Sequence, residues 1–283
     1  PVAHVDEEFY LYVGRAILDG QLPYVDVWDR KPIGLFLIYA GIAALGGDGV
    51  VQMHLVAGVF AALTAFVISR IANRVAKFPG GLFAAIVYLV MLPVLSGDTA
   101  QSPVFYNLFM ATAAFILVRS LYEPEIYFPR LQAVLAMLLV GMSIFVKQTA
   151  LFEGFWFGLA FLYIDWKSSS SLRHALVTAA LLFCVSLAPL SLMYAAYALL
   201  GHFGEIWQAT VGSVLSKSSL DAELVQKLAL IMAIRVSVLS ACTIFGIWRL
   251  RKLDRQLGRF LTGWLIASLL GLFAVPNFYD HYI

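Results

Sequence analysis

Charged residues are scarce in this sequence. They make up 13% of its 283 residues, against about 25% in soluble domains. Apolar residues reach 61%, above the 45–50% of soluble domains, so an ordinary soluble domain and a disordered chain are both excluded. A net charge of +2, with no stretch that interleaves basic and aromatic residues, gives no reason to expect a nucleic-acid partner.

Cysteine is also rare. Cys184 and Cys242 are the only two; both lie in apolar runs and lack a Cys-x-x-Cys spacing, so no disulfide framework is predicted. The pair His4 and Asp6 is too small for a metal site, and no His/Cys cluster completes it. We therefore expect neither a metal nor a cofactor.

Long apolar runs are what the sequence has in abundance. A membrane-spanning helix needs about 20 mostly apolar residues. Eight runs are of this kind, although the fourth and fifth are short and predict a tight hairpin at Lys147-Gln148-Thr149. The runs are 50–69, 80–97, 103–121, 131–147, 149–165, 174–200, 224–248 and 260–276. The sequence thus predicts an all-α, polytopic integral membrane protein with about eight transmembrane helices.

The apolar run 32–47 is shorter, and charge decides how to interpret it. If it does not cross, one side of the membrane holds twelve of the nineteen basic residues and the other holds the acids of residues 1–49. The twelve are Arg70, Arg74, Lys77, Arg119, Arg130, Lys167, Arg173, Arg249, Arg251, Lys252, Arg255 and Arg259. The positive-inside rule favours this arrangement. We expect one module, 1–283, in the cell membrane, with 1–49 as an outer loop with interfacial helices and 50–283 as transmembrane helices.

The first 32 residues combine acids, bases and aromatic residues. A solvated acidic loop is the simpler interpretation. Against it, Tyr10, Tyr24 and Trp28 are residues that anchor a segment at headgroup depth. Polar chemistry held at a membrane surface is what a lipid-linked substrate requires.

Five motifs follow one another along the chain. They are Asp6-Glu7, Asp19-Gly20-Gln21-Leu22-Pro23-Tyr24, Lys31-Pro32-Ile33-Gly34, the element from Gly141 to Lys147-Gln148-Thr149, and Asn277-Phe278-Tyr279-Asp280-His281-Tyr282. In this order they resemble the membrane glycosyltransferases of the GT-C fold, in particular the protein O-mannosyltransferase and aminoarabinose transferase group. The sequence departs from that pattern at Ile33, where the family has a second proline, and at Arg30, where the aminoarabinose transferases have an acid.

The resemblance implies an activity. Such enzymes move a monosaccharide, with inversion, from a polyprenyl-phosphate donor to a glycan, lipid or protein acceptor on the outer, periplasmic or extracellular, face of the membrane. Because the family has further helices at both ends, the resemblance also implies that this chain is a fragment. The expected partners are the polyprenyl-phosphate donor, the acceptor and membrane lipids. No nucleic-acid partner is expected.

The residue types fit this chemistry independently. A carboxylate must take the proton of the acceptor hydroxyl, and Asp6 is our candidate base. Cations must neutralise the leaving phosphate. Lys31, at headgroup depth, and Arg235, about eleven residues into an apolar run, are the main candidates; each has snorkelling toward the lipid headgroups as its simpler interpretation.

Other residues complete the predicted substrate site. They are Glu7, Tyr10, Arg30, Asp98, Lys147 and His281. Lys147 and Glu153 have a simpler interpretation as a pair within the hairpin. Two other functions stay open: a transporter or flippase of lipid-linked sugars, with Arg235 and Glu153 on its pathway, and a structural or assembly protein.

Overall fold

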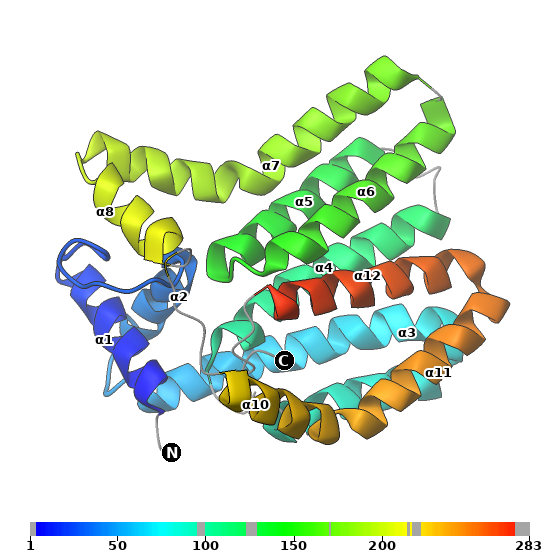
Figure 1. Cartoon of the computed structure of the whole chain (residues 1–283), viewed down its shortest axis with the longest axis horizontal. Coiled ribbons are helices and arrows are strands. Elements are labelled where there is room, and N and C mark those ends of the chain that lie inside the picture. Colours follow the sequence, from blue (N-terminus) through cyan, green and yellow to red (C-terminus); the bar gives the residue numbers. More distant parts are fainter. Residues whose placement is uncertain are drawn as a thin grey trace. The chain divides into compact units, whose positions relative to one another are not determined.

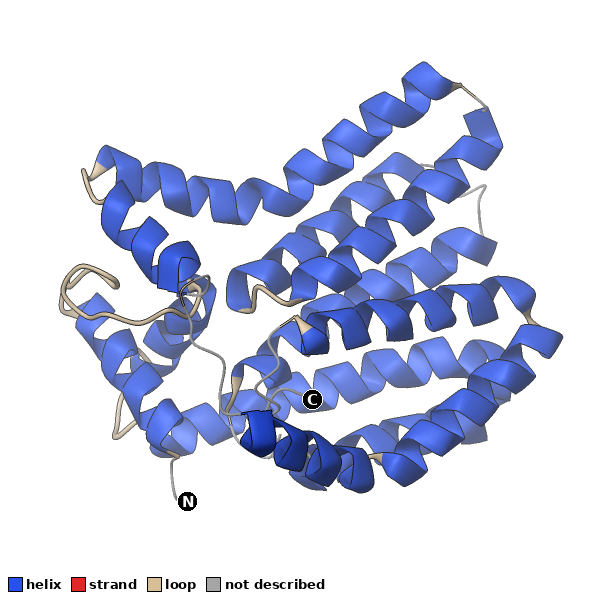
Figure 2. Ribbon diagram, viewed as in Figure 1, coloured by secondary structure: helices blue, strands red, loops and turns tan. Residues whose placement is uncertain are grey.

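The computed structural model describes residues 4–94, 100–122, 129–169, 171–213, 216 and 222–274. Within these residues the fold is helical, and the only β contact is an isolated bridge between Pro23 and Val27 (Figures 1 and 2). The helices are α1 (Val5–Leu18), α2 (Ile33–Ala43), α3 (Val50–Val94), α4 (Ser102–Tyr122), α5 (Pro129–Val146), α6 (Ala150–Ser169), α7 (Leu172–Leu199), α8 (Phe203–Trp207), the π-helix η1 (Gln208–Gly212), α10 (Ala222–Arg235), α11 (Ser237–Leu253) and α12 (Arg255–Phe273). The predicted all-α class is confirmed.

Four of the described helices are long and apolar enough to cross a membrane. They are α3, α4, α7 and α12. A fifth crossing is added if α10 and α11, which bend by 61° across a short break, form one span. An all-α membrane protein is therefore supported, and the predicted number of eight crossings is not confirmed.

The chain divides into two compact units, which we describe separately. The first comprises Pro1–Ala111, Gly141–Gln148 and Leu187–Ser218. The second comprises Thr112–Val140, Thr149–Ser186 and Ser219–Ile283. The boundary passes through α4, α5 and α7, so each unit contains parts of these helices. The expected single module stays a prediction.

Helix α1 of the first unit is closed at both ends by local interactions. Three acids in its first turn interact favourably with the positive end of the helix dipole. The Glu7 carboxylate accepts the backbone N–H of His4 at 2.8 Å. At the other end Gly20 has a φ of +84°, and the backbone N–H of Gln21 reaches the carbonyl of Ala16 at 2.9 Å. This is a Schellman ending, which glycine adopts without strain.

Helix α2 packs closely on α1. At Gly14 an added Cβ would lie 2.6 Å from the backbone carbon of Tyr39, so the absence of a side chain allows this approach. Tyr39 is fully buried, its ring lies 5.4 Å from that of Tyr10, and its hydroxyl donates to the carbonyl of Ala100 at 2.7 Å. With 11 residues, or about 16 Å, α2 is too short to cross a bilayer core of about 30 Å.

Helix α3 is a hairpin of two helices. Lys77 interrupts it with φ +57° and ψ −172°. Beyond this break, a Cβ on Gly81 would lie 2.7 Å from the carbonyl oxygen of Ser69, whereas twelve residues of continuous helix would separate the two by about 18 Å. The chain therefore folds back at Lys77, which lies between the predicted runs 50–69 and 80–97.

In the second unit α12 packs on α6 and on α11. The indole N–H of Trp156, on α6, donates to the carbonyl of Phe260 at 3.0 Å. Asp254 separates α11 from α12, and its Oδ1 accepts the N–H groups of Gln256 at 3.1 Å and Leu257 at 3.0 Å. These bonds cap the first turn of α12.

Candidate active site

Asp6, Tyr10 and Lys31 come together in the first unit. Asp6 and Tyr10 lie one turn apart on α1, and the Tyr10 hydroxyl is 3.5 Å from Asp6 Oδ2. Lys31, just before α2, places its Nζ 5.4 Å from the centre of the Tyr10 ring. Tyr10 is buried at 2% exposure, whereas Asp6 is exposed. A carboxylate and an ammonium group thus flank one buried tyrosine at the surface of the unit.

The loop between α1 and α2 fixes the backbone of Lys31. The Tyr24 hydroxyl donates to the Lys31 carbonyl at 2.8 Å, and Asp29 Oδ1 accepts the Lys31 N–H at 2.6 Å. Tyr24 itself has a φ of +71°, a strained value for a residue with a side chain. Its buried ring, 5.7 Å from that of Tyr197, holds it in this conformation.

The Lys31 ammonium group is partly desolvated. Burial lowers the pKa of Lys31 below its usual 10.5. The charges of Asp6 and Asp29 act in the opposite direction, and the charge of Arg30 adds to the lowering. An ammonium group that has lost part of its water shell interacts strongly with an incoming anion.

A second lysine approaches from α5. At Gly34, on α2, an added Cβ would lie 2.7 Å from the carbonyl carbon of Phe145. Lys31 precedes Gly34 by three residues and Lys147 follows Phe145 by two, so this contact brings both lysine-bearing segments together. The Nζ of Lys147 lies 5.7 Å from the centre of the Tyr106 ring. Each lysine is thus held against a tyrosine face, a cation–π arrangement.

Hydrogen bonds hold the segment that follows Lys147. The side chain of Gln148 donates to the carbonyl of Thr210, in η1, at 3.0 Å. The hydroxyls of Thr210 and Tyr194 lie 2.7 Å apart. The predicted turn at 147–149 is therefore attached to α7 and η1.

Glu7, a predicted substrate-binding residue, is engaged in hydrogen bonds to the backbone. Its side chain is fully buried, and its two carboxylate oxygens accept the backbone N–H groups of His4 and Ala100. The hydrogen bond from Ala100 joins the start of α1 to the residues that precede α4. Because both oxygens of this buried carboxylate already accept backbone N–H groups, Glu7 is better suited to positioning Asp6 than to contacting a substrate.

The remaining predicted residues are Arg30, Arg235, Asp98 and His281. Arg30 is exposed beside Lys31. Arg235 is exposed in the second unit, as the last residue of α10. Asp98 and His281 lie outside the described residues. Of the predicted set, the first unit gathers Asp6, Glu7, Tyr10, Arg30 and Lys31 around the α1–α2 loop and brings in the segment of Lys147.

Sequence reasoning missed three residues that shape this site. Tyr24 and Asp29 belong to the polar segment that suggested the site, but nothing in the sequence tells which backbone groups they bind. Tyr106 carries no local signal, because it meets Lys147 only through packing between α4 and α5. Glu153 accepts from Trp264 Nε1 at 2.5 Å and from Ser268 Oγ at 3.0 Å, and its pairing with Lys147 stays a prediction.

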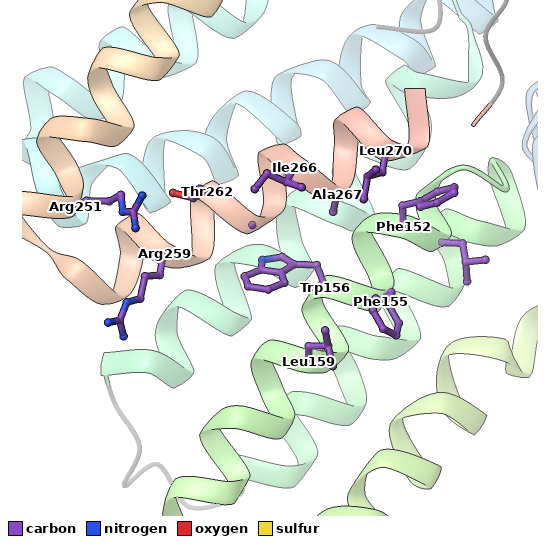
Figure 3. Close-up of a pocket in the computed structure, with 12 residues that line it drawn as sticks. Phe152, Phe155, Trp156, Leu159, Arg251, Arg259, Thr262, Ile266, Ala267 and Leu270 are labelled. Carbon is purple, nitrogen blue, oxygen red and sulfur yellow. The ribbon is translucent and has the colours of Figure 1, made fainter. Parts of the chain in front are cut away.

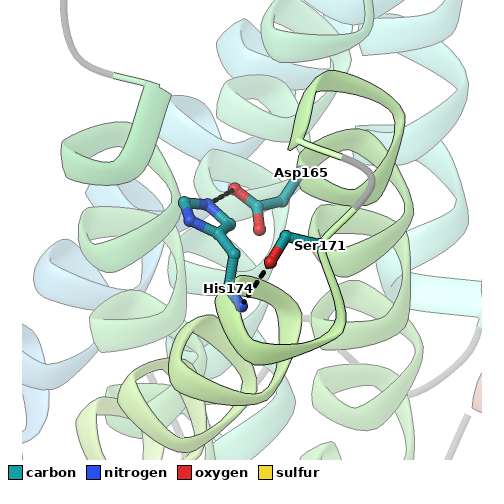
Figure 4. A network of polar contacts seen from close by, with 3 residues as sticks. All are labelled: Asp165, Ser171 and His174. Carbon is teal, nitrogen blue, oxygen red and sulfur yellow. Dashed lines mark hydrogen bonds and ion pairs between the residues drawn. The ribbon is translucent and has the colours of Figure 1, made fainter.

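A Ser–His–Asp set occurs in the second unit, at the turn between α6 and α7 (Figure 4). His174 Nε2 lies 3.0 Å from Asp165 Oδ1, and the Ser171 hydroxyl oxygen accepts the backbone N–H of His174 at 3.4 Å. In a catalytic triad the serine contacts the imidazole ring. Here it contacts the backbone, so the three residues stabilise the turn.

Comparison of the chain with protein-family models, with curated proteins and with solved structures gives no match.

Proposed function

We propose that this protein is a membrane glycosyltransferase of GT-C type, which moves a monosaccharide from a polyprenyl-phosphate donor to an acceptor on the outer face. The observation that carries the proposal is the grouping of Asp6 with Lys31 over Tyr10, together with the Gly34–Phe145 contact that brings in the segment of Lys147. The grouping supplies one carboxylate for a proton and two ammonium groups for a phosphate.

The reaction follows from these roles. An acceptor hydroxyl attacks the anomeric carbon from the face opposite the phosphate, and the bond between that carbon and the phosphate oxygen breaks, which inverts the configuration. Asp6 takes the hydroxyl proton. The pair of electrons leaves on the polyprenyl phosphate, whose charge Lys31 and Lys147 neutralise. A phosphate is a good leaving group at neutral pH, so no general acid is needed.

The topology that we propose puts this site on the outer face. Helix α2 is too short to cross, so it would lie in the interface on α1. The fold-back at Lys77 would make two crossings of α3 and put its turn, with Arg70, Arg74 and Lys77, on the cytoplasmic side. With α5 and α6 as the short hairpin and α10–α11 as one bent span, the number of crossings would be the predicted eight.

Asp6→Asn tests the proposal directly. The amide keeps the size of the side chain but cannot take the proton, so we expect transfer from a synthetic polyprenyl-phosphate sugar, in membranes containing the protein, to fall by about 10²–10⁴-fold. Glu8→Gln is the matched control, because Glu8 is an exposed acid on the same turn. It should transfer at the wild-type rate. Transfer by Asp6→Asn within about threefold of wild type would exclude Asp6 as the base.

One observation favours a transporter or flippase as the second candidate. The break between α10 and α11 interrupts an apolar segment immediately after Arg235, and interrupted helices that carry polar groups are typical of transport sites. This alternative predicts that Asp6→Asn still moves lipid-linked sugar across vesicle membranes, whereas Arg235→Gln does not. The glycosyltransferase proposal predicts instead that Asp6→Asn loses sugar transfer to the acceptor.

A further inference from the structure

The second unit contains a groove that the proposed chemistry does not use. Helices α6 and α12 enclose it, and its volume is about 770 Å³ (Figure 3), within the range of about 300–1,000 Å³ for small-molecule sites. Its walls are apolar and include Phe152, Phe155, Trp156, Ile266 and Leu270. Such a groove accommodates a hydrocarbon chain.

One end of the groove is cationic. Arg251, from α11, and Arg259, from α12, line it beside Thr262, as Figure 3 shows. Both arginines are exposed, and neither forms an ion pair with another described residue. Two guanidinium groups at one end of an apolar groove are complementary to an amphiphile with an anionic head.

The length of the groove indicates which amphiphile fits. Along α12 it extends from Arg259 to Leu270, eleven residues or about 16 Å. The hydrocarbon core of one leaflet is about 15 Å thick, half of the full 30 Å. The groove therefore matches a lipid of a single leaflet, with its head at the arginines and its chain beside the aromatic residues.

We propose that this groove binds an anionic phospholipid, with its phosphate between Arg251 and Arg259 and one acyl chain against Trp156 and Phe155. The segment 249–259 carries five basic residues, which in the proposed topology face the cytoplasmic leaflet, where anionic lipids give a negative surface. The donor phosphate would be bound at the opposite face. The choice of phospholipid over donor thus depends on the proposed orientation.

Lipid binding to the purified protein tests this assignment without measuring transfer. Native mass spectrometry would compare phosphatidylglycerol with phosphatidylcholine on the wild type, on Arg251→Gln/Arg259→Gln and on Arg255→Gln. A basic residue near an anionic surface contributes about fivefold in affinity, so the double variant should bind phosphatidylglycerol about 25-fold more weakly. Glutamine keeps the part of the Arg251 stem that packs on Gly258. Arg255→Gln is the control, because Arg255 belongs to the same basic segment, 249–259, but is not part of the groove lining.

Further variants complete the test. Each single arginine variant should lose about fivefold, which keeps the comparison valid if the double variant does not fold. Leu159→Trp, which replaces an aliphatic side chain of the groove lining by a bulkier indole, should weaken the binding of both lipids. Equal losses in the double variant and in Arg255→Gln, or equal binding of the two lipids by the wild type, would overturn the proposal. If a short polyprenyl phosphate displaces phosphatidylglycerol from the wild type but does not bind the arginine variants, that result would assign the groove to the donor and overturn the proposed orientation. The enzymatic proposal itself is tested separately, by Asp6→Asn.

Discussion

Gly34 on α2 lies directly against the backbone carbonyl of Phe145 on α5. The contact is possible only because residue 34 has no side chain, and it joins the segment that follows Lys31 to the segment that precedes Lys147. The close approach of α2 and α5 thus brings together the two segments whose lysines we assign to the donor phosphate. Because neither lysine acts alone in the proposed reaction, the packing at Gly34 is as important to the site as the charges.

Gly34→Ala tests this packing. The added methyl group has to displace backbone, so we expect the free energy of unfolding in detergent to fall by about 1–3 kcal/mol, and sugar transfer to fall with it as Lys31 and Lys147 separate. Gly41→Ala is the matched control on the same helix, because nothing lies within 4 Å of a Cβ there. It should be neutral or gain up to about 1 kcal/mol. Equal effects of the two substitutions would show that the close contact is not needed.

The pH dependence of donor binding tests Lys31. Burial lowers the pKa of Lys31 below its usual 10.5, and only the protonated form attracts phosphate. The KM for the donor should therefore be lowest at pH values below this lowered pKa and should increase as the pH rises through it. Lys31→Arg should abolish this increase, because a guanidinium group stays charged, while it recovers only part of the wild-type rate.

Lys31→Met provides the second half of that experiment. Removing one charge-stabilising donor costs about 10²–10³-fold in rate, so transfer should fall by about 100-fold or more while the protein still folds and inserts. Wild-type transfer by Lys31→Met would leave snorkelling toward lipid headgroups as the role of Lys31.

The sequence predicts the helical segments well, because apolar runs and turn residues are local signals. The run boundary near Lys77 coincides with the fold-back of α3, and the shortness of the run 32–47 corresponds to the 11-residue α2. The number of membrane crossings is harder to predict from the sequence than the helices are, because it depends on whether a bent or folded helix is counted as one crossing or two.

The candidate site is predicted only in part. Asp6, Tyr10 and Lys31 share one polar segment, and their grouping could be expected from their closeness in sequence. The bond from Glu7 to Ala100 spans 93 residues, and the positions of Tyr106 and Phe145 depend on how α4 and α5 pack. Side-chain pairing over such separations has no periodic signature in one sequence. From the sequence alone, a buried carboxylate that binds backbone groups, such as Glu7, therefore looks the same as one that binds a substrate.

Glu153 offers a test between a structural and a transport role. Its carboxylate accepts from Trp264 and Ser268, so Glu153→Ala leaves both donors without this acceptor and should lower the free energy of unfolding by about 1–3 kcal/mol. Glu153→Gln retains a carbonyl oxygen and should lose less. Thermal unfolding in detergent measures both. A pathway residue would behave differently, with unchanged unfolding of Glu153→Ala and loss of transport.

The orientation of the chain is tested by labelling single cysteines in intact cells. Cys184 and Cys242 are exposed, so both are first replaced by serine, and Asp26→Cys, Lys77→Cys and Lys252→Cys are then made one at a time.

An impermeant maleimide should label position 26 from outside, because the loop between α1 and α2 carries the outer site. Positions 77 and 252 should be labelled only after the membrane is permeabilised, because they lie in the basic turns that the positive-inside rule puts in the cytoplasm. Labelling of positions 26 and 77 from the same side would mean that the segment of α2 crosses the membrane or that the part of α3 before Lys77 does not. Either result would overturn the proposed topology. Labelling of 77 and 252 from opposite sides would instead change the number of crossings between α3 and α12 and leave the site at Asp6 and Lys31 where we propose it.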